Sequence, residues 1–371
     1  MKFVETADLK RGMRLARPIY NKQGVLLFER DSKLTPLAID SVRNFGLIGV
    51  YILEPAEPLP PLSQEDIEFE RFQTMTVYSI QGEMERLLTS RRQSRLPSIV
   101  STIIKNYGHL DGNINFYQNL RSKDDYVCRH ALNTAILCTM ITHVLNVKVE
   151  EQIQIVTAAL LHDIGKIQME KDVLFKRDGE TDNEMIYQEQ MRDLEILEEA
   201  FVDGTHLKRI CMQTIHAQHE FLVNGNSELE MKFVLGAKIL LVANRYDELT
   251  AMNLHGESQS ESEVKAIKEF REHPKLYDAD VVEALVRSVK ILFPGVSVEL
   301  NTGEKALVLT ENRKDVLRPT VLVFRDNSIL DLSAKANEDF EIVDIMKTMD
   351  NRYVMDIEAL KAAGFTGDGE S

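Results

Sequence analysis

The sequence predicts a mainly α-helical protein, in which a helical bundle is flanked by a small N-terminal α+β module and a small C-terminal β-rich module. Apolar residues recur at helical spacing through most of residues 64–293. At both ends of the chain, short β-like runs alternate with turn residues instead. The change of period at Pro294-Gly295 marks the end of the helical region.

The N-terminal module is expected to cover residues 1–54. Two strand-like runs, 15–20 and 24–28, flank a polar segment that is typical of a hairpin turn. A short helix over 36–44 and a strand over 48–53 follow, with Gly46 between them. Residues 55–63 are rich in proline and predict a linker.

The helical domain is expected to cover residues 64–293. A long helix begins after Ser63, which is placed to cap it. The more polar segment 172–193 predicts a mixture of loop and helix. The other predicted helices are 129–146, 150–162, one within 201–219, 229–250, 261–270 and 280–293.

The C-terminal module is expected over residues 294–350, followed by a tail over 351–371. Its predicted strands are 297–300, 305–310, 320–324 and 329–332. The segment Asn301-Thr-Gly303 between the first two is typical of a hairpin turn.

Composition excludes several classes of partner. The chain of 371 residues carries 44 basic and 59 acidic side chains, a net charge of −15, which opposes extended binding to DNA, RNA or an anionic membrane. The least charged stretch, 131–147, is interrupted by polar residues, so no membrane insertion is expected. The N-terminus lacks a signal-peptide pattern and the three cysteines form no paired framework. We therefore expect a cytoplasmic protein.

The adjacent pair His162-Asp163 is the most informative feature for function. It ends an apolar run and is followed by Gly165 and Lys166. Burying either side chain without a partner is costly, whereas imidazole and carboxylate together suit zinc, iron or manganese. The alternative is a hydrogen-bonded core histidine at a helix end. Lys166 has two interpretations, a phosphate ligand or a cation at a helix C-terminus.

Five further polar residues are candidates for the same site. His130 begins an apolar helix one helix-turn-helix length before His162, so the two histidines can converge. His216 and His219 share a helix face, although two ordinary half-exposed histidines explain them equally well. Asn244 and Asp247 end another apolar helix, where a solvated helix end is the alternative.

These motifs together resemble the HD superfamily, and specifically its HD-GYP branch. The resemblance rests on Leu160-Leu-His-Asp-Ile-Gly-Lys-Ile167, on His130-Ala131 and on Val242-Ala-Asn-Arg-Tyr-Asp-Glu-Leu-Thr250, and spans about residues 122–293. It implies a helical domain that binds two or three metals, often iron or manganese, and hydrolyses cyclic di-GMP. It also implies that Asp163 bridges metals and that Lys166 lies near a phosphate. Residues 1–54 resemble the small domain that often precedes HD-GYP domains.

The chain departs from the HD-GYP pattern at several ligand positions. Residues 188–191 lack the histidine that the family has in this region, and Gln218 replaces one of its two paired histidines. Asn244 replaces the family's ligand aspartate, and Tyr126 stands where some members have glutamate. The Gly-Tyr-Pro sequence is missing. The ligands that remain are His130, His162, Asp163 and His219, with His216 or Asp247 as possible substitutes. One divalent metal, or none, is therefore expected.

Three functions follow from this pattern. The first is a regulatory HD-GYP-like domain of cyclic di-GMP signalling with weak or no activity. The second is an active metal-dependent phosphohydrolase of cyclic di-GMP or another nucleotide, with Asp163 and Lys166 as catalytic residues. The third is a scaffold whose terminal modules bind a protein partner. The sequence predicts no oligomeric state.

Overall fold

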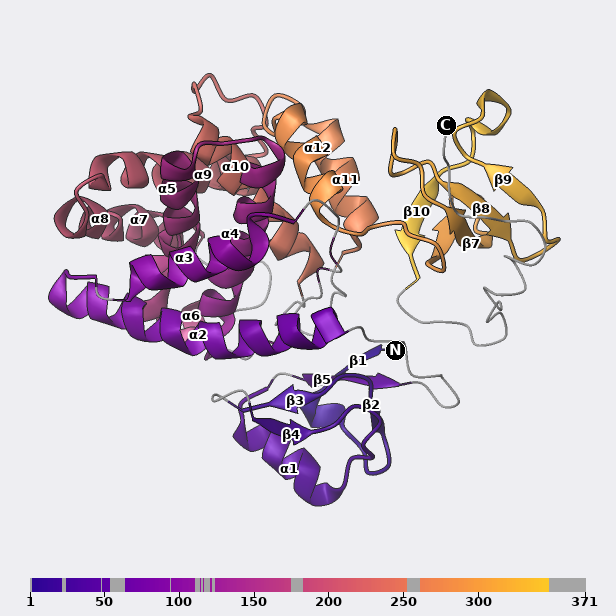
Figure 1. The fold of residues 1–371 in the computed structure, drawn as a ribbon, viewed down its shortest axis with the longest axis horizontal. Helices are drawn as coiled ribbons and strands as arrows, with labels where there is room; N and C mark the ends of the chain where they lie inside the picture. The colour runs from indigo at the N-terminus through magenta and orange to yellow at the C-terminus, as the bar shows by residue number, and fades with distance from the viewer. Residues whose placement is uncertain are drawn as a thin grey trace.

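A computed structural model of the chain describes residues 2–21, 25–47, 49–53, 64–93, 95–110, 114, 116, 121, 124–174, 183–251 and 261–346. It consists of a helical bundle with a small sheet-containing module at either end, as Figure 1 shows. This confirms the predicted fold class. The expected linker over 55–63 and the tail over 351–371 lie outside the described residues.

The bundle is built around α4 (Tyr126–Val144), which is almost entirely buried. Against it pack α2 (Gln64–Ser90), α3 (Leu96–Tyr107), α5 (Val149–Leu161), α10 (Leu235–Thr250) and α12 (Ala279–Ser288). The helix α9 (Gly204–Asn224) packs on α5 and α10, and α11 (Glu263–Glu272) packs on α10 and α12. Shorter segments follow α5, namely η2 (Ile164–Gln168), α6 (Lys171–Leu174), α7 (Asn183–Asp193) and α8 (Glu195–Ala200). Sixteen consecutive side chains of α4, from Val127 to Thr142, are buried, so polar side chains on this helix must find partners inside the protein.

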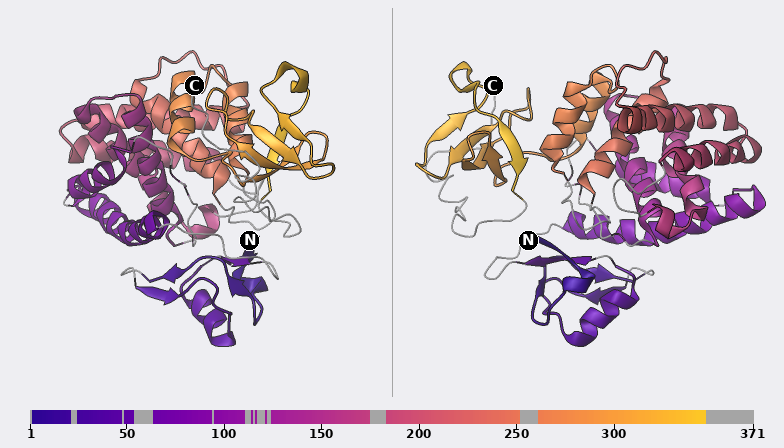
Figure 2. Two further views of the ribbon diagram at one scale, coloured as in Figure 1. Left: turned by 45° about the vertical axis from the view of Figure 1, so that its right-hand side comes forward. Right: turned by 180° about the vertical axis from the view of Figure 1, so that it is seen from behind.

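The N-terminal module contains a three-stranded antiparallel sheet, in the order β1 (Lys2–Glu5), β5 (Gly49–Leu53), β2 (Arg14–Leu15). A second ribbon pairs β3 (Ile19–Tyr20) with β4 (Leu26–Phe28), and α1 (Pro36–Asn44) packs its apolar face into the module's own core. Arg17 of this module lies 3.8 Å from Glu70 of α2, which places the module along that helix in the views of Figure 2.

The C-terminal module is a five-stranded antiparallel sheet in the order β10-β6-β7-β8-β9. Its strands are β6 (Ser297–Leu300), β7 (Lys305–Thr310), β8 (Thr320–Val323), β9 (Ile329–Asp331) and β10 (Ile342–Ile345). The turn between β6 and β7 needs a positive φ, which Gly303 supplies at 78°. Ion pairs such as Arg271–Asp315, at 2.9 Å, connect α11 to this module.

Candidate metal centre

The antiparallel pair α4 and α5 brings the predicted site residues to one end of the bundle. His130 lies in the second turn of α4, and His162 is the residue that ends α5. The chain then turns through Asp163 into η2, and Gly165 lets α7 approach closely. A Cβ atom at position 165 would lie 3.0 Å from Asp193 Oδ2 and 3.3 Å from the Cα atom of Gln190.

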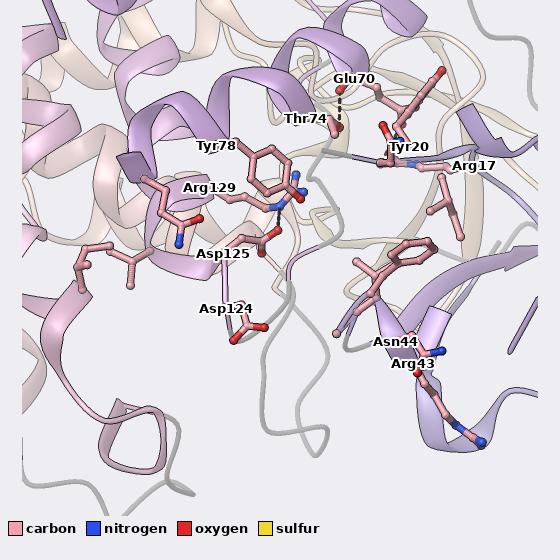
Figure 3. Close-up of a pocket in the computed structure, with 18 of the residues that line it drawn as sticks. Arg17, Tyr20, Arg43, Asn44, Glu70, Thr74, Tyr78, Asp124, Asp125 and Arg129 are labelled. Carbon is pink, nitrogen blue, oxygen red and sulfur yellow. Dashed lines mark hydrogen bonds and ion pairs between the residues drawn. The ribbon is translucent and has the colours of Figure 1, made fainter. Parts of the chain in front are cut away.

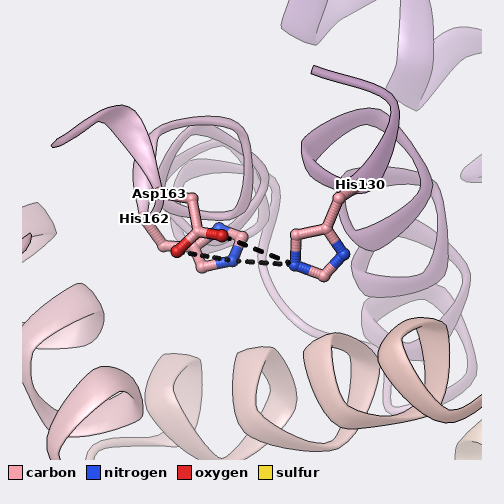
Figure 4. Close-up of side chains that lie close together, drawn as sticks. All are labelled: His130, His162 and Asp163. Carbon is pink, nitrogen blue, oxygen red and sulfur yellow. Dashed lines mark hydrogen bonds and ion pairs between the residues drawn. The ribbon is translucent and has the colours of Figure 1, made fainter. Parts of the chain in front are cut away.

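His130, His162 and Asp163 form a buried cluster, which Figure 4 shows. The two Nε2 atoms are 3.3 Å apart. Asp163 Oδ2 lies 3.8 Å from Nε2 of His130, and Asp163 Oδ1 lies 3.8 Å from Nε2 of His162. Among the residues that the structure describes, this is the one group of three or more His, Cys, Asp or Glu side chains close enough to share an ion. Its members come from two helices and the turn that follows the second helix.

Both imidazole rings are oriented by acceptors on their far side. Nδ1 of His130 lies 2.6 Å from Asp247 Oδ2, and Nδ1 of His162 lies 2.8 Å from the carbonyl oxygen of Ala159. A carboxylate and a carbonyl only accept hydrogen bonds, so each Nδ1 carries the proton. In the neutral ring the lone pair is then on Nε2, directed into the cluster, which is the arrangement of most metal-ligating histidines.

Asn244 of α10 supplies a fourth acceptor atom to the cluster. Its Oδ1 lies 2.6 Å from His130 Nε2 and 3.0 Å from His162 Nε2. Its amide nitrogen instead donates to Gln218 Oε1 at 2.6 Å. Two ring nitrogens, an amide oxygen and a carboxylate therefore face one another in a buried site. Such a set of acceptors fits a divalent transition metal.

Asp163 is also held by two donors from its own side of the site. Lys166 Nζ donates to Oδ2 at 2.8 Å and Gln190 Nε2 donates to Oδ1 at 2.7 Å. Burial alone would raise the pKa of Asp163, but Lys166 and the two histidines outweigh it, so the pKa lies below its usual range. The pKa of Lys166 is raised in turn, because the charge of Asp163 outweighs the effect of burial. Both residues are therefore charged at neutral pH.

The neighbouring carboxylate of Asp247 is fully buried and fully engaged. One terminal nitrogen of Arg121 lies 2.7 Å from each of its oxygens, and Asn133 donates to Oδ1 at 2.9 Å. Burial lowers the pKa of His130, but its hydrogen bond to Asp247 outweighs this and the pKa is raised. By contrast, burial dominates at His162, whose pKa is lowered. Asp247 thus orients His130 from behind.

Three of the candidate residues lie outside the cluster. Asp247 contacts Nδ1 of His130 on the side facing away from the cluster. His219 lies outside the cluster, where its ring stacks on Tyr187 at 4.1 Å and its Nε2 is 3.2 Å from Glu184. His216 accepts or donates a hydrogen bond with the Tyr187 hydroxyl at 3.0 Å. On α9 it is Gln218, not its neighbour His219, that faces Asn244.

A cavity of about 790 Å³ adjoins the site on the side of Lys166, and Figure 3 shows most of its lining. It lies between the N-terminal module and the helices α2 and α4. The charged side chains that line it are balanced in sign: Arg17, Arg43, Arg129 and Lys166 against Glu70, Glu85, Asp124 and Asp125. Tyr20, Phe45 and Tyr78 add aromatic surface. Such walls suit a ligand that has both flat rings and charged groups.

Sequence reasoning missed several residues of the site. Gln190 lies in the polar segment that gave no clear pattern, and its contact with Asp163 depends on the close approach of α7 at Gly165. Arg121 precedes α4 and reaches a residue 126 positions away, which no local pattern reveals.

Among the described residues, no helix combines the length and apolar character that crossing a membrane requires.

Comparison with known proteins gives a family match over the part of the chain that contains the cluster. Residues 115–281 match the HD domain family. A stretch of 211 residues is 24% identical to the cyclic di-GMP phosphodiesterase PA4108 of Pseudomonas aeruginosa, covering 55% of this chain and 49% of that protein. The chain thus spans about half the length of that relative.

A solved structure, Bd1817, described as an HDG"Y"P protein from Bdellovibrio bacteriovorus, is 15% identical with a TM-score of 0.43, covering 76% of this chain and 97% of that one. The expected resemblance to the HD superfamily is confirmed by the family match, which contains the His130, His162 and Asp163 cluster. Residues 115–281, less than half of the chain, are thus similar to the HD domain family.

Proposed function

We propose that the domain binds one divalent transition metal, iron or manganese, and acts as a regulatory module of cyclic di-GMP signalling with weak or no phosphodiesterase activity. The metal would be held by His130, His162, Asp163 and Asn244. The proposal rests on one observation: acceptor atoms of all four residues face one another in a buried site. When both imidazoles are neutral, none of these facing atoms carries a proton to donate. A cation is the natural complement of such a set.

The chemistry of the four ligands supports this choice. When bound, a divalent metal supplies a Lewis acid that polarises a phosphoryl oxygen. The residues of the chain orient the ligands: Asp247 and the Ala159 carbonyl hold the two imidazoles, and Lys166 and Gln190 hold the carboxylate. Partners of this kind typically change metal affinity by about 10–100-fold.

Charge and hydrogen bonding favour one metal over two. Both oxygens of Asp163 already accept a hydrogen bond, one of them from the Lys166 ammonium group. At an effective dielectric constant of about 20, two unit charges 4 Å apart interact with about 4 kcal/mol. A second divalent ion at Asp163 would meet roughly that repulsion from the Lys166 ammonium group for each of its charges. Among the described residues, the cluster contains no carboxylate besides Asp163 to offset it. This argues for weak or absent two-metal catalysis.

The cavity beside Lys166 supports a nucleotide ligand. A phosphate that entered there would meet the ammonium group on a side chain that is 24% exposed. The aromatic side chains further along the cavity suit a base. The named activity of the Pseudomonas relative points to cyclic di-GMP or a related nucleotide. In this proposal residues 1–54 form a module that closes over the ligand, and residues 64–293 form the domain that holds the metal.

Localisation and protein partners are part of the same proposal. Cys128, Cys138 and Cys211 are free and buried, which suits a reducing compartment such as the cytoplasm. The C-terminal module, residues 294–350, would be the surface for a protein partner, since its β9 edge presents the exposed side chain of Ile329.

One experiment separates the regulatory function from the enzymatic one. Purified protein, loaded anaerobically with iron or manganese, is mixed with cyclic di-GMP, and both binding and linear product are measured. We expect binding with little or no product. Product that disappears in Asp163→Ala would establish the alternative, an active phosphohydrolase, which the retained Asp163–Lys166 pair favours. Absence of both binding and product would refute both functions.

A further inference from the structure

The orientation of the Asn244 amide is the feature on which the proposed metal site depends most. An amide presents either an oxygen or an NH₂ group, and only the oxygen can serve as a metal ligand. An aspartate at this position would present an oxygen in either orientation. Asn244 therefore needs a device that fixes which end faces His130 and His162.

We propose that Glu248 and Gln218 are positioning residues that fix this orientation through a directed chain of hydrogen bonds. The proposal rests on the proposed metal site and deepens it. Gln218 Nε2 donates to Glu248 Oε2, and Asn244 Nδ2 donates to Gln218 Oε1 at 2.6 Å. Gln218 comes from α9, while Asn244 and Glu248 lie one turn apart on α10.

The direction of the chain follows from the chemistry of its end. The Glu248 carboxylate can only accept, so Gln218 must turn its NH₂ group toward it. The oxygen of Gln218 then faces Asn244, and an oxygen can only accept. Asn244 must therefore direct its NH₂ group toward Gln218 and its Oδ1 toward the two imidazoles. A single carboxylate thus sets the orientation of two amides.

Glu248 is itself held in place from the other side. Arg245 Nη1 lies 3.7 Å from Glu248 Oε2. The same guanidinium group makes two hydrogen bonds to Glu269 of α11, at 2.7 and 2.8 Å. The Glu248 side chain is 22% exposed, and its tip lies against Gln218. The chain of contacts therefore starts at a carboxylate of α10 that Arg245 connects to α11.

The test compares two variants in two backgrounds, with Mn²⁺ as the probe. Glu248→Gln keeps size and shape but can either donate or accept, so it no longer imposes a direction. We expect its dissociation constant for Mn²⁺ to rise by about tenfold, the lower end of the effect of such partners. Gln218→Met breaks the chain outright and is expected to lose at least as much, without further loss in the double variant.

The same substitution in the Asn244→Asp background separates orientation from any general structural role. A carboxylate presents an oxygen whichever end faces the imidazoles, so Glu248→Gln should there cause no loss of Mn²⁺ affinity. Co²⁺-loaded protein gives a second readout, because its visible absorption changes when an oxygen ligand is lost. The matched control is Glu283→Gln, which replaces an exposed ion-pair partner of Arg287 and should leave the Mn²⁺ affinity unchanged.

The outcomes distinguish the two proposals. Wild-type protein that does not bind Mn²⁺ would overturn both the metal site and the positioning role. Wild-type protein that binds Mn²⁺, with Glu248→Gln unchanged, would overturn the positioning role alone. An equal loss of affinity in the wild-type and Asn244→Asp backgrounds would also overturn it, since a general structural effect does not depend on which end of residue 244 faces the metal.

Discussion

Replacing Asp247 with asparagine should affect both the stability and the metal affinity of this protein, although Asp247 is not one of the four proposed ligands. The carboxylate is fully buried, and one nitrogen of the buried Arg121 lies 2.7 Å from each of its oxygens. Removing one partner of a buried ion pair costs about 3–5 kcal/mol, because the remaining charge is left uncompensated. We expect a loss of this size in the free energy of unfolding of Asp247→Asn.

The effect on the metal arises through His130. Asp247 holds the Nδ1 proton of that ring, and in the variant one amide oxygen must serve both Arg121 and His130. Loss of such a partner should weaken Mn²⁺ binding by about 10–100-fold. Urea unfolding measures the stability and competition with a chelator measures the affinity.

The control is Asp315→Asn, which removes an exposed ion pair with Arg271 and should cost less than about 1 kcal/mol. The reasoning is refuted if Asp247→Asn matches this control in stability, or if it binds Mn²⁺ as tightly as the wild-type protein.

Three further predictions follow from other contacts of the site. Lys166→Met should weaken binding of cyclic di-GMP by about tenfold or more, because a hydrogen bond to a charged group contributes about 1.5–3 kcal/mol. Lys105→Met, on the exposed face of α3, is the control and should leave the affinity unchanged. Equal affinities of the two variants, measured by calorimetry, would contradict the placement of the ligand. Gly165→Ala should lower the free energy of unfolding by about 1–3 kcal/mol, because the added Cβ atom would crowd α7. Gly82→Ala is the control, because a Cβ atom there meets open space, and it should not lower the free energy of unfolding. An unchanged free energy of unfolding in Gly165→Ala would show that α7 can move away. A triple variant should raise the metal content from one ion per chain to two and introduce formation of the linear product; its substitutions are Gln190→His, Gln218→His and Asn244→Asp. An unchanged metal content would show that these three positions cannot hold a second metal ion.

Local patterns predicted the parts of the molecule that depend on neighbouring residues in the sequence. The predicted helix over 129–146 corresponds to α4, and the end of α5 falls at His162, where an apolar run gives way to polar residues. The helix α3 was not identified separately, and α4 begins at Tyr126, so His130 lies inside the helix and not at its start. Boundaries shift in this way because tertiary packing extends or shortens the helix ends.

The site was predictable as far as helical spacing reaches. His130, His162 and Asp163 converge because α4 and α5 are joined by a short connection and run antiparallel. The sequence analysis named His219 as a ligand, whereas Gln218 faces Asn244, because the facing residue depends on the rotation of α9 against α10. The roles of Arg121 and Gln190 depend on contacts between segments that are distant in the sequence, which periodicity does not encode.

The number of Mn²⁺ ions bound per chain, measured by titration in the wild-type protein and in His162→Ala, decides whether the buried cluster is a one-metal site. We expect one ion in the wild-type protein and none in the variant, because His162 Nε2 is part of the only close set of His, Cys, Asp or Glu ligand atoms among the described residues. Two ions in the wild-type protein, or one ion that His162→Ala does not remove, would contradict it.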